Sequence, residues 1–259
     1  MGIPQAAGEF LSFLRYPIFD YKRDQPLSFG MVTLLFFVVF AVEMLLFAPM
    51  SLLLGLEDMP HAMQDVLENL ASWKVFLVAV IIAPIAEEFI FRFHLRYESL
   101  LFLFLLFMMV LFVALFSGSF TEINNIVQLN ASDSLQPVTI RSENLVNLWP
   151  LFLTIFLALV FGLIYVVSEK FQSAADAFST NQFPMIFYWT AAVFALVHVF
   201  NFELDSDRWY IAPLLVFPQF FLALYLGYLR VRNNIFYSIY VHALNNSIPM
   251  ILVLIYGVK

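Results

Sequence analysis

The chain has 259 residues, of which 63% are hydrophobic, 18% aromatic and only 12% charged, and its mean hydropathy is +0.89. This composition excludes an ordinary soluble globular domain, and a formal net charge of −7 offers no basic surface for a nucleic acid. The absence of cysteine excludes disulfides, thiolate metal ligands and a cysteine nucleophile. Because the apolar runs are continuous and about twenty residues long, we expect an all-α, polytopic membrane helix bundle in one membrane-embedded domain, residues 1–259.

The first segment, residues 1–27, mixes apolar and charged side chains. Phe10, Phe13 and Phe19 are interspersed with Glu9 and Arg15, a pattern that suits a helix lying in the membrane interface. An ordinary cytoplasmic tail is the alternative. We expect no cleaved signal, because no basic segment precedes a short apolar core with a small-residue cleavage site.

Seven apolar stretches follow, and each is close to the roughly twenty residues that cross a bilayer core. They are Ser28–Leu54, Trp73–Arg96, Leu100–Ser117, Leu148–Ser168, Pro184–Phe202, Ile211–Leu229 and Ile235–Val258. Cations accumulate on the inner side of membrane proteins, and an N-in, C-out arrangement places eight cations inside and four outside. The eight are Arg15, Lys22, Arg23, Arg92, Arg96, Lys170, Arg230 and Arg232; the four are Lys74, Arg141, Arg208 and Lys259. We therefore predict a seven-span integral membrane protein, N-in and C-out, of a bacterial cytoplasmic membrane.

The second stretch carries ionisable groups that are costly in lipid unless they are paired or used. Glu88 and Arg92 are four residues apart and share a helix face, where an ion pair offsets part of the cost of burial. Glu87 is turned about 100° away and has no partner on its own helix. Pro84 lacks an N–H and predicts a bend just before the acidic pair. A purely structural ion pair is the alternative, and His94, nearer the inner interface, is left out of the site.

The fifth and seventh stretches each place a histidine one turn from another distinctive residue: Phe194 with His198, and His242 with Asn246. Together with Glu87, the two histidines and Asn246 fall within about four residues, roughly 6 Å, of the middle of their stretches. A carboxylate can take a proton from water, an imidazole can hold that water or a metal, and imidazole and carboxamide can donate to an oxyanion. The combination predicts a buried site that hydrolyses an amide bond without a covalent intermediate.

Three sequence patterns resemble one known family. Glu87-Glu88-x-x-x-Arg92, Phe194-x-x-x-His198 and His242-x-x-x-Asn246 are similar to the three motifs of the CPBP family, also called Abi. That family includes type II CAAX prenyl endopeptidases and bacteriocin-processing or self-immunity proteins. The run Gly227-Tyr228-Leu229-Arg230, shortly before the third motif, also resembles the family.

The resemblance implies a role for each motif residue. Glu87 would be the general base, His198 would position the water, and His242 and Asn246 would stabilise the oxyanion. Glu88 and Arg92, with Phe194, would support the site. We expect no cofactor, because one carboxylate and two imidazoles on three helices have no evident second shell of partners; zinc held by Glu87, His198 and His242 is the alternative.

The spacing of the motifs departs from the family. The second motif usually follows the first by a few tens of residues, whereas here His198 comes more than 100 residues after Arg92. We therefore expect a catalytic core of residues 73–97 and 184–259, interrupted by an inserted helical hairpin, residues 99–168, with an outer loop at 118–147. An inserted hairpin crosses the membrane twice and so leaves the direction of the second-motif helix unchanged.

The leading hypothesis is an intramembrane endopeptidase whose partners are the bilayer and a peptide or protein substrate in or at the membrane. A non-catalytic bacteriocin-immunity or scaffold protein of the same fold is the alternative. A proton-coupled transporter is a third possibility that the intramembrane ionisable residues allow, although no repeated halves are found. The sequence leaves open whether a substrate is prenylated.

Overall fold

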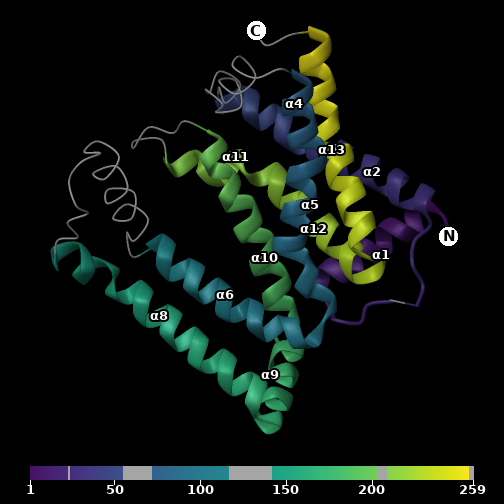
Figure 1. The fold of residues 1–259 in the computed structure, drawn as a ribbon. Helices are drawn as coiled ribbons and strands as arrows, with labels where there is room; N and C mark the ends of the chain where they lie inside the picture. The colour runs from purple at the N-terminus through teal and green to yellow at the C-terminus, as the bar shows by residue number, and fades with distance from the viewer. Residues whose placement is uncertain (23, 55–71, 117–141, 203–208, 257–259) are drawn as a thin grey trace. The chain divides into compact units, whose positions relative to one another are not determined.

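In a computed structural model, the described part of the chain comprises residues 1–22, 24–54, 72–116, 142–202 and 209–256. Nearly all of these residues are helical (Figure 1), which confirms the predicted all-α class. The helices are α1 (Ile3–Arg15), α2 (Phe29–Leu54), α4 (Ser72–Leu77), α5 (Ala83–Arg92), α6 (Glu98–Phe116), α8 (Ser142–Val167), α9 (Glu169–Asn181), α10 (Phe183–Val197), α11 (Ala212–Leu215), α12 (Phe217–Arg232) and α13 (Ile235–Tyr256).

Each of the seven predicted stretches contains helix, but the helices do not all qualify as membrane spans. Within the described residues, three segments are long and apolar enough to cross a bilayer: Phe29–Pro49, Pro150–Val167 and Phe183–Asn201. The sixth stretch is divided at Val216 into α11 and α12. The protein is therefore an integral membrane protein, while seven spans and the N-in, C-out orientation stay predictions. Most of the predicted outer loop lies outside the described residues, and α8 begins within its last part.

Two short helices lie beyond the predicted stretches. Helix α1 ends at Arg15 because Pro17 disfavours a helical conformation for the residue before it, and Tyr16 is extended at ψ 86°. Helix α9 is mostly polar, so a search for long apolar runs passes over it. The interfacial interpretation of residues 1–27 thus meets a helix, but one that covers only Ile3–Arg15.

The chain divides into two compact units. Unit 1 comprises residues 1–97 and 182–259, and unit 2 comprises residues 98–181. In unit 2, α6, α8 and α9 pack together, with the ring of Phe102 stacked 5.3 Å from that of Tyr165. The hairpin expected at 99–168 falls within unit 2. Its origin as an insertion, and the single membrane-embedded domain, stay predictions.

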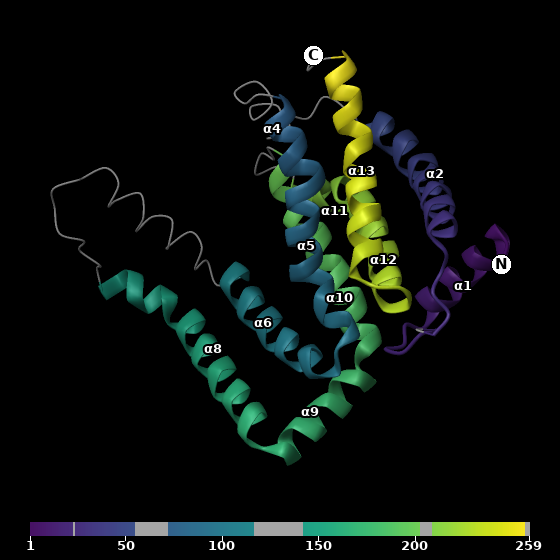
Figure 2. The ribbon, with the colours of Figure 1, turned by 45° about the vertical axis from the view of Figure 1, so that its right-hand side comes forward.

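Unit 1 contains all three motifs. Figures 1 and 2 show α4 continuing into α5 as one column beside α13. Helices α10 and α12 also pack closely, and Gly227 allows this, since a Cβ there would lie 2.7 Å from Cε2 of the buried Phe187. The rings of Phe13 and Phe183 hold Phe187 from other sides. This contact therefore fixes the separation of α10, which leads into the second motif, from α12.

The N-terminal segment is fastened to the end of α12. Glu9 binds Lys22 at 2.6 Å and also pairs with Arg232. Asn233 exchanges two hydrogen bonds with the backbone of Leu27, at 3.2 and 2.8 Å. Burial raises the pKa of the Glu9 carboxyl, but the hydrogen bonds and charges of Lys22 and Arg232 outweigh it, so that this pKa lies below its ordinary value.

Candidate active site

The first motif follows a local change of helix type. Between α4 and α5 the backbone forms a π-helical turn, Val78–Ile82, and Pro84 opens α5, where its missing N–H is least costly. A π-helical turn, a feature that is frequent at functional sites, thus lies just before Pro84, while the bend expected there stays a prediction. The turn precedes two adjacent glutamates in different surroundings: Glu87 is 28% exposed, and Glu88 is completely buried.

Glu88 is the centre of a buried polar cluster. Its Oε1 accepts hydrogen bonds from Arg92 Nη1 at 2.8 Å and from His242 Nδ1 at 3.0 Å. Its Oε2 accepts a hydrogen bond from the hydroxyl of Ser238. Because a buried carboxylate is stable only when its lone pairs and charge are satisfied, this cluster joins α5 firmly to α13.

Glu87 faces both histidines. Its Oε2 lies 3.8 Å from His198 Nε2 and 3.8 Å from His242 Nε2. Among the described residues this buried oxygen has no hydrogen-bond partner. A separation of 3.8 Å is too long for a direct hydrogen bond, but it is one that a bridging water can serve. The three atoms therefore surround one place where a small polar molecule can bind.

The other nitrogen of each ring determines which form of the imidazole faces Glu87. His198 Nδ1 lies 2.8 Å from the carbonyl oxygen of Phe194, which can only accept, so Nδ1 carries the proton. His242 Nδ1 in the same way donates to Glu88. Both neutral rings then present the lone pair of Nε2 toward Glu87, a tautomer assigned from the hydrogen-bond partners. The partners that the sequence did not show are thus a backbone carbonyl and a buried carboxylate.

Phe194 connects the first two motifs. The Arg92 guanidinium carbon lies 3.7 Å from the centre of the Phe194 ring, within the range of a cation–π contact. The same ring lies 4.6 Å from the His198 ring and 5.6 Å from the His242 ring. Its side chain therefore packs against the ion pair and both imidazoles, while its carbonyl fixes His198.

Asn246 lies in the same unit but contacts a different group. Its amide donates to the carbonyl oxygen of Ala79, in the π-helical turn, at 2.9 Å. Its side-chain oxygen accepts from Asn245 at 3.4 Å. One N–H of the Asn246 amide is thus used within the protein, leaving the second for another acceptor. The expected oxyanion role of Asn246 stays a prediction.

The donor atoms of the Glu87 cluster suit zinc in kind, since each histidine donates its other N–H to an acceptor, as metal-binding histidines usually do. In arrangement they fit less well. Among the described residues, no group of three or more histidine, aspartate or glutamate side chains is placed to hold a metal ion.

Sequence reasoning missed two polar residues of unit 1. Ser238, a small polar residue in an apolar helix, gives no signal without its partner. Glu43 did give one: it is a carboxylate within the apolar segment Phe29–Pro49, and it is only 5% exposed. His94 is buried near Thr190, with 3.4 Å between its Nε2 and the hydroxyl oxygen, apart from the Glu87 cluster.

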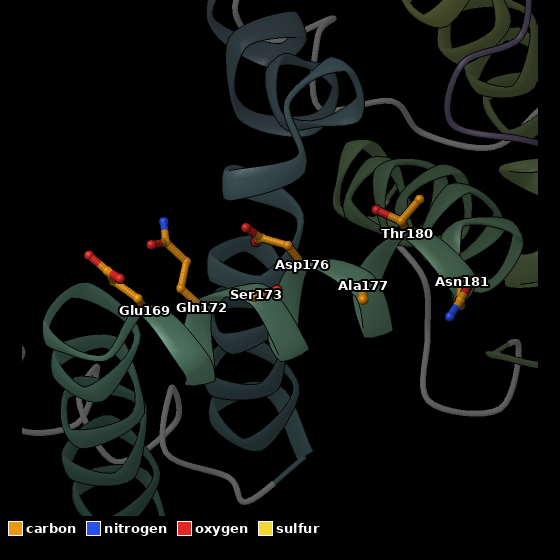
Figure 3. Close-up of a pocket in the computed structure, with 7 residues that line it drawn as sticks. All are labelled: Glu169, Gln172, Ser173, Asp176, Ala177, Thr180 and Asn181. Atoms are coloured by element: carbon orange, nitrogen blue, oxygen red, sulfur yellow. The ribbon is translucent and has the colours of Figure 1, made fainter.

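Two hollows lie on unit 2 and contain none of the motif residues. One, of about 510 Å³, follows the polar side of α9, where Glu169, Gln172 and Asp176 project on one side of the helix (Figure 3). The other, of about 610 Å³, is an apolar groove between α6 and α8. Neither brings together a carboxylate and an imidazole.

The chain is thus an all-helical membrane protein with a glutamate between two histidines. Residues 171–248 match the family model described as "Type II CAAX prenyl endopeptidase Rce1-like". This match confirms the resemblance to the CPBP family over that part of the chain. It covers the second and third motifs, whereas Glu87, Glu88 and Arg92 lie outside it and are joined to those motifs by tertiary contacts. No curated protein and no solved structure matches the chain.

Proposed function

We propose that this protein is a membrane-embedded endopeptidase that hydrolyses a peptide bond with water activated by Glu87. The observation that supports the proposal most directly is the position of Glu87 Oε2, 3.8 Å from the Nε2 atoms of His198 and His242. A carboxylate oxygen without a protein partner, facing two imidazole lone pairs, is suited to hold and deprotonate one water.

The proposed reaction balances as follows. Glu87 takes a proton from water while the water oxygen bonds to the carbonyl carbon of the scissile peptide. His198, held through Phe194, orients the water. The oxyanion accepts hydrogen bonds from Asn246, through its second amide N–H, and from His242 when that ring carries a proton on Nε2 as well. The C–N bond then breaks, and Glu87 returns its proton to the leaving amine.

Glu88 supports His242 in this proposal. A buried carboxylate that accepts from Nδ1 holds the ring in place and offsets the charge that it gains with a second proton, as the aspartate of a Ser-His-Asp triad does. If zinc were bound, Glu87, His198 and His242 would hold it, and it would polarise the attacking water. The metal-free version remains our proposal.

The family name supplies the substrate class to test first, a peptide with a prenylated C-terminal CAAX sequence. The purified protein in liposomes should cleave this peptide, and the same peptide without the prenyl group shows whether the lipid is needed. Glu87→Gln and His198→Ala should each abolish cleavage while leaving insertion and thermal unfolding close to those of the unmodified protein. Full cleavage by either variant would refute the proposal. Peptide binding without cleavage would favour the immunity or scaffold alternative. The proposed location is a bacterial cytoplasmic membrane.

A further inference from the structure

Ser238 lies in the polar cluster at the centre of unit 1. It precedes His242 by one turn of α13, and both side chains face Glu88 on α5. Ser238 is completely buried, and its hydroxyl is within reach of two acceptors, Glu88 Oε2 and the carbonyl of Leu226 at 3.3 Å. A hydroxyl has one proton to donate. Since a bond to a carboxylate is the stronger of the two, that proton goes to Glu88.

The two oxygens of Glu88 are bound unequally. Arg92 and His242 both donate to Oε1, whereas Ser238 is the donor on Oε2 within the described part of the chain. The terminal torsion of a glutamate side chain is broad, so two donors on one oxygen leave the carboxylate plane free to turn. A third donor on the other oxygen prevents that rotation.

The orientation of the Glu88 carboxylate affects the reaction site through the ring of His242. His242 Nδ1 must stay on Oε1 for its Nε2 to face Glu87 at 3.8 Å. If the carboxylate turned, the ring would tilt with it, and its Nε2 would no longer face Glu87. We propose that Ser238 is a positioning residue for His242, acting through Glu88. The effect of Ser238 on the reaction rate rests on the proposed function, whereas its effect on the position of the His242 ring does not.

The test removes the hydroxyl of Ser238 and compares the effect on kcat with that of removing another serine hydroxyl from the same helix. Ser238→Ala should lower kcat for the CAAX peptide by about 10-fold to 100-fold, by analogy with the loss when a group that orients a metal-binding histidine is removed. KM should stay within about twofold, since Ser238 is buried away from substrate. Ser247→Ala is the control, because its hydroxyl donates to Leu244 on the same helix and does not touch Glu88. An equal fall of kcat in the control would overturn the proposal.

A second measurement needs no catalysis. The ¹⁵N signals of the His242 ring, assigned by their loss in His242→Gln, report which nitrogen carries the proton. Ser238→Ala should change these signals and Ser247→Ala should not; unchanged signals in Ser238→Ala refute the positioning role. If no peptide is cleaved by the unmodified protein, the proposed function fails while this measurement still decides the role of Ser238.

A double substitution separates this role from packing. If Ser238 acts through Glu88, Ser238→Ala should lower kcat no further in the Glu88→Gln background. Independent, multiplying effects would show that the hydroxyl acts elsewhere. Ser238→Cys, which keeps a weak donor of similar shape, should lie between the unmodified protein and Ser238→Ala. It also tests the proposal if the alanine variant does not fold.

Discussion

The Nδ1 atom of His242 lies 3.0 Å from Oε1 of Glu88, a carboxylate with no exposed surface. The opposite nitrogen of the same ring faces Glu87. His242 therefore joins two neighbouring glutamates that have different surroundings: one is bound on every side by protein donors, and the other is available to a water. This difference leads to the first prediction.

Glu87→Gln and Glu88→Gln should have unequal effects on the free energy of unfolding. Glu88→Gln removes the charge that compensates Arg92 and should lower the free energy of unfolding by about 3–5 kcal/mol, as expected when one partner of a buried ion pair is lost. Glu87→Gln should change it by less than about 1 kcal/mol, because Glu87 is partly exposed and its Oε2 has no partner in the described part of the protein. Thermal unfolding in detergent measures both. Equal losses would contradict the division of roles.

The metal-free proposal predicts that chelation has no effect. Dialysis against EDTA should leave the rate of peptide cleavage unchanged, and elemental analysis should find much less than one zinc per chain. The zinc alternative predicts the opposite: stoichiometric zinc that is lost in His198→Ala, and activity that EDTA removes and zinc restores. The elemental measurement distinguishes the two even in an inactive preparation.

Gly227→Ala should destabilise the contact between α10 and α12. The new Cβ would lie 2.7 Å from a carbon of Phe187, which is 1% exposed and enclosed by other rings. Overpacking of this kind typically costs about 1–3 kcal/mol. Gly162→Ala on α8 is the matched control, since its Cβ would have no atom within 4 Å. Thermal unfolding should show a loss only for Gly227→Ala, and a similar loss in both variants would contradict this account of the helix contact.

The attachment of the N-terminal segment should weaken in acid. Glu9 has a lowered pKa in the folded protein, after the effects of burial, Lys22 and Arg232 are combined. Its ion pairs therefore contribute their full stability above the ordinary glutamate pKa of 4.5, and they lose it as the pH falls through the lower folded value.

The Glu9→Gln variant isolates this effect. Thermal unfolding should show it less stable than the unmodified protein at pH 6, with a difference that shrinks below about pH 4.5. Glu169 is exposed, so Glu169→Gln serves as a control and should be as stable as the unmodified protein at both pH values. A difference between Glu9→Gln and the unmodified protein that grows in acid would reverse the assigned sign.

The sequence by itself determined the fold class, the resemblance to a family and the candidate residues. Continuous apolar runs require helices in a bilayer, because every backbone polar group must be satisfied within its own segment. Ionisable residues in such runs are rare enough to mark Glu87, His198 and His242 without a structure. Residues four apart share a helix face, so the pairing of Glu88 with Arg92 was predictable from spacing alone.

Only the tertiary structure decided which groups face one another. Spacing along one helix contains no information about the rotation of another, so neither the bond from Ser238 to Glu88 nor that from Asn246 to Ala79 had a sequence signal. The same holds for the Glu88 carboxylate that accepts from His242 Nδ1, whereas the carbonyl that accepts from His198 Nδ1 belongs to Phe194, one turn earlier in the chain. The chemistry of each side chain is local to the sequence, but Ser238 and His242, which bind Glu88, lie 150 and 154 residues away from it along the chain.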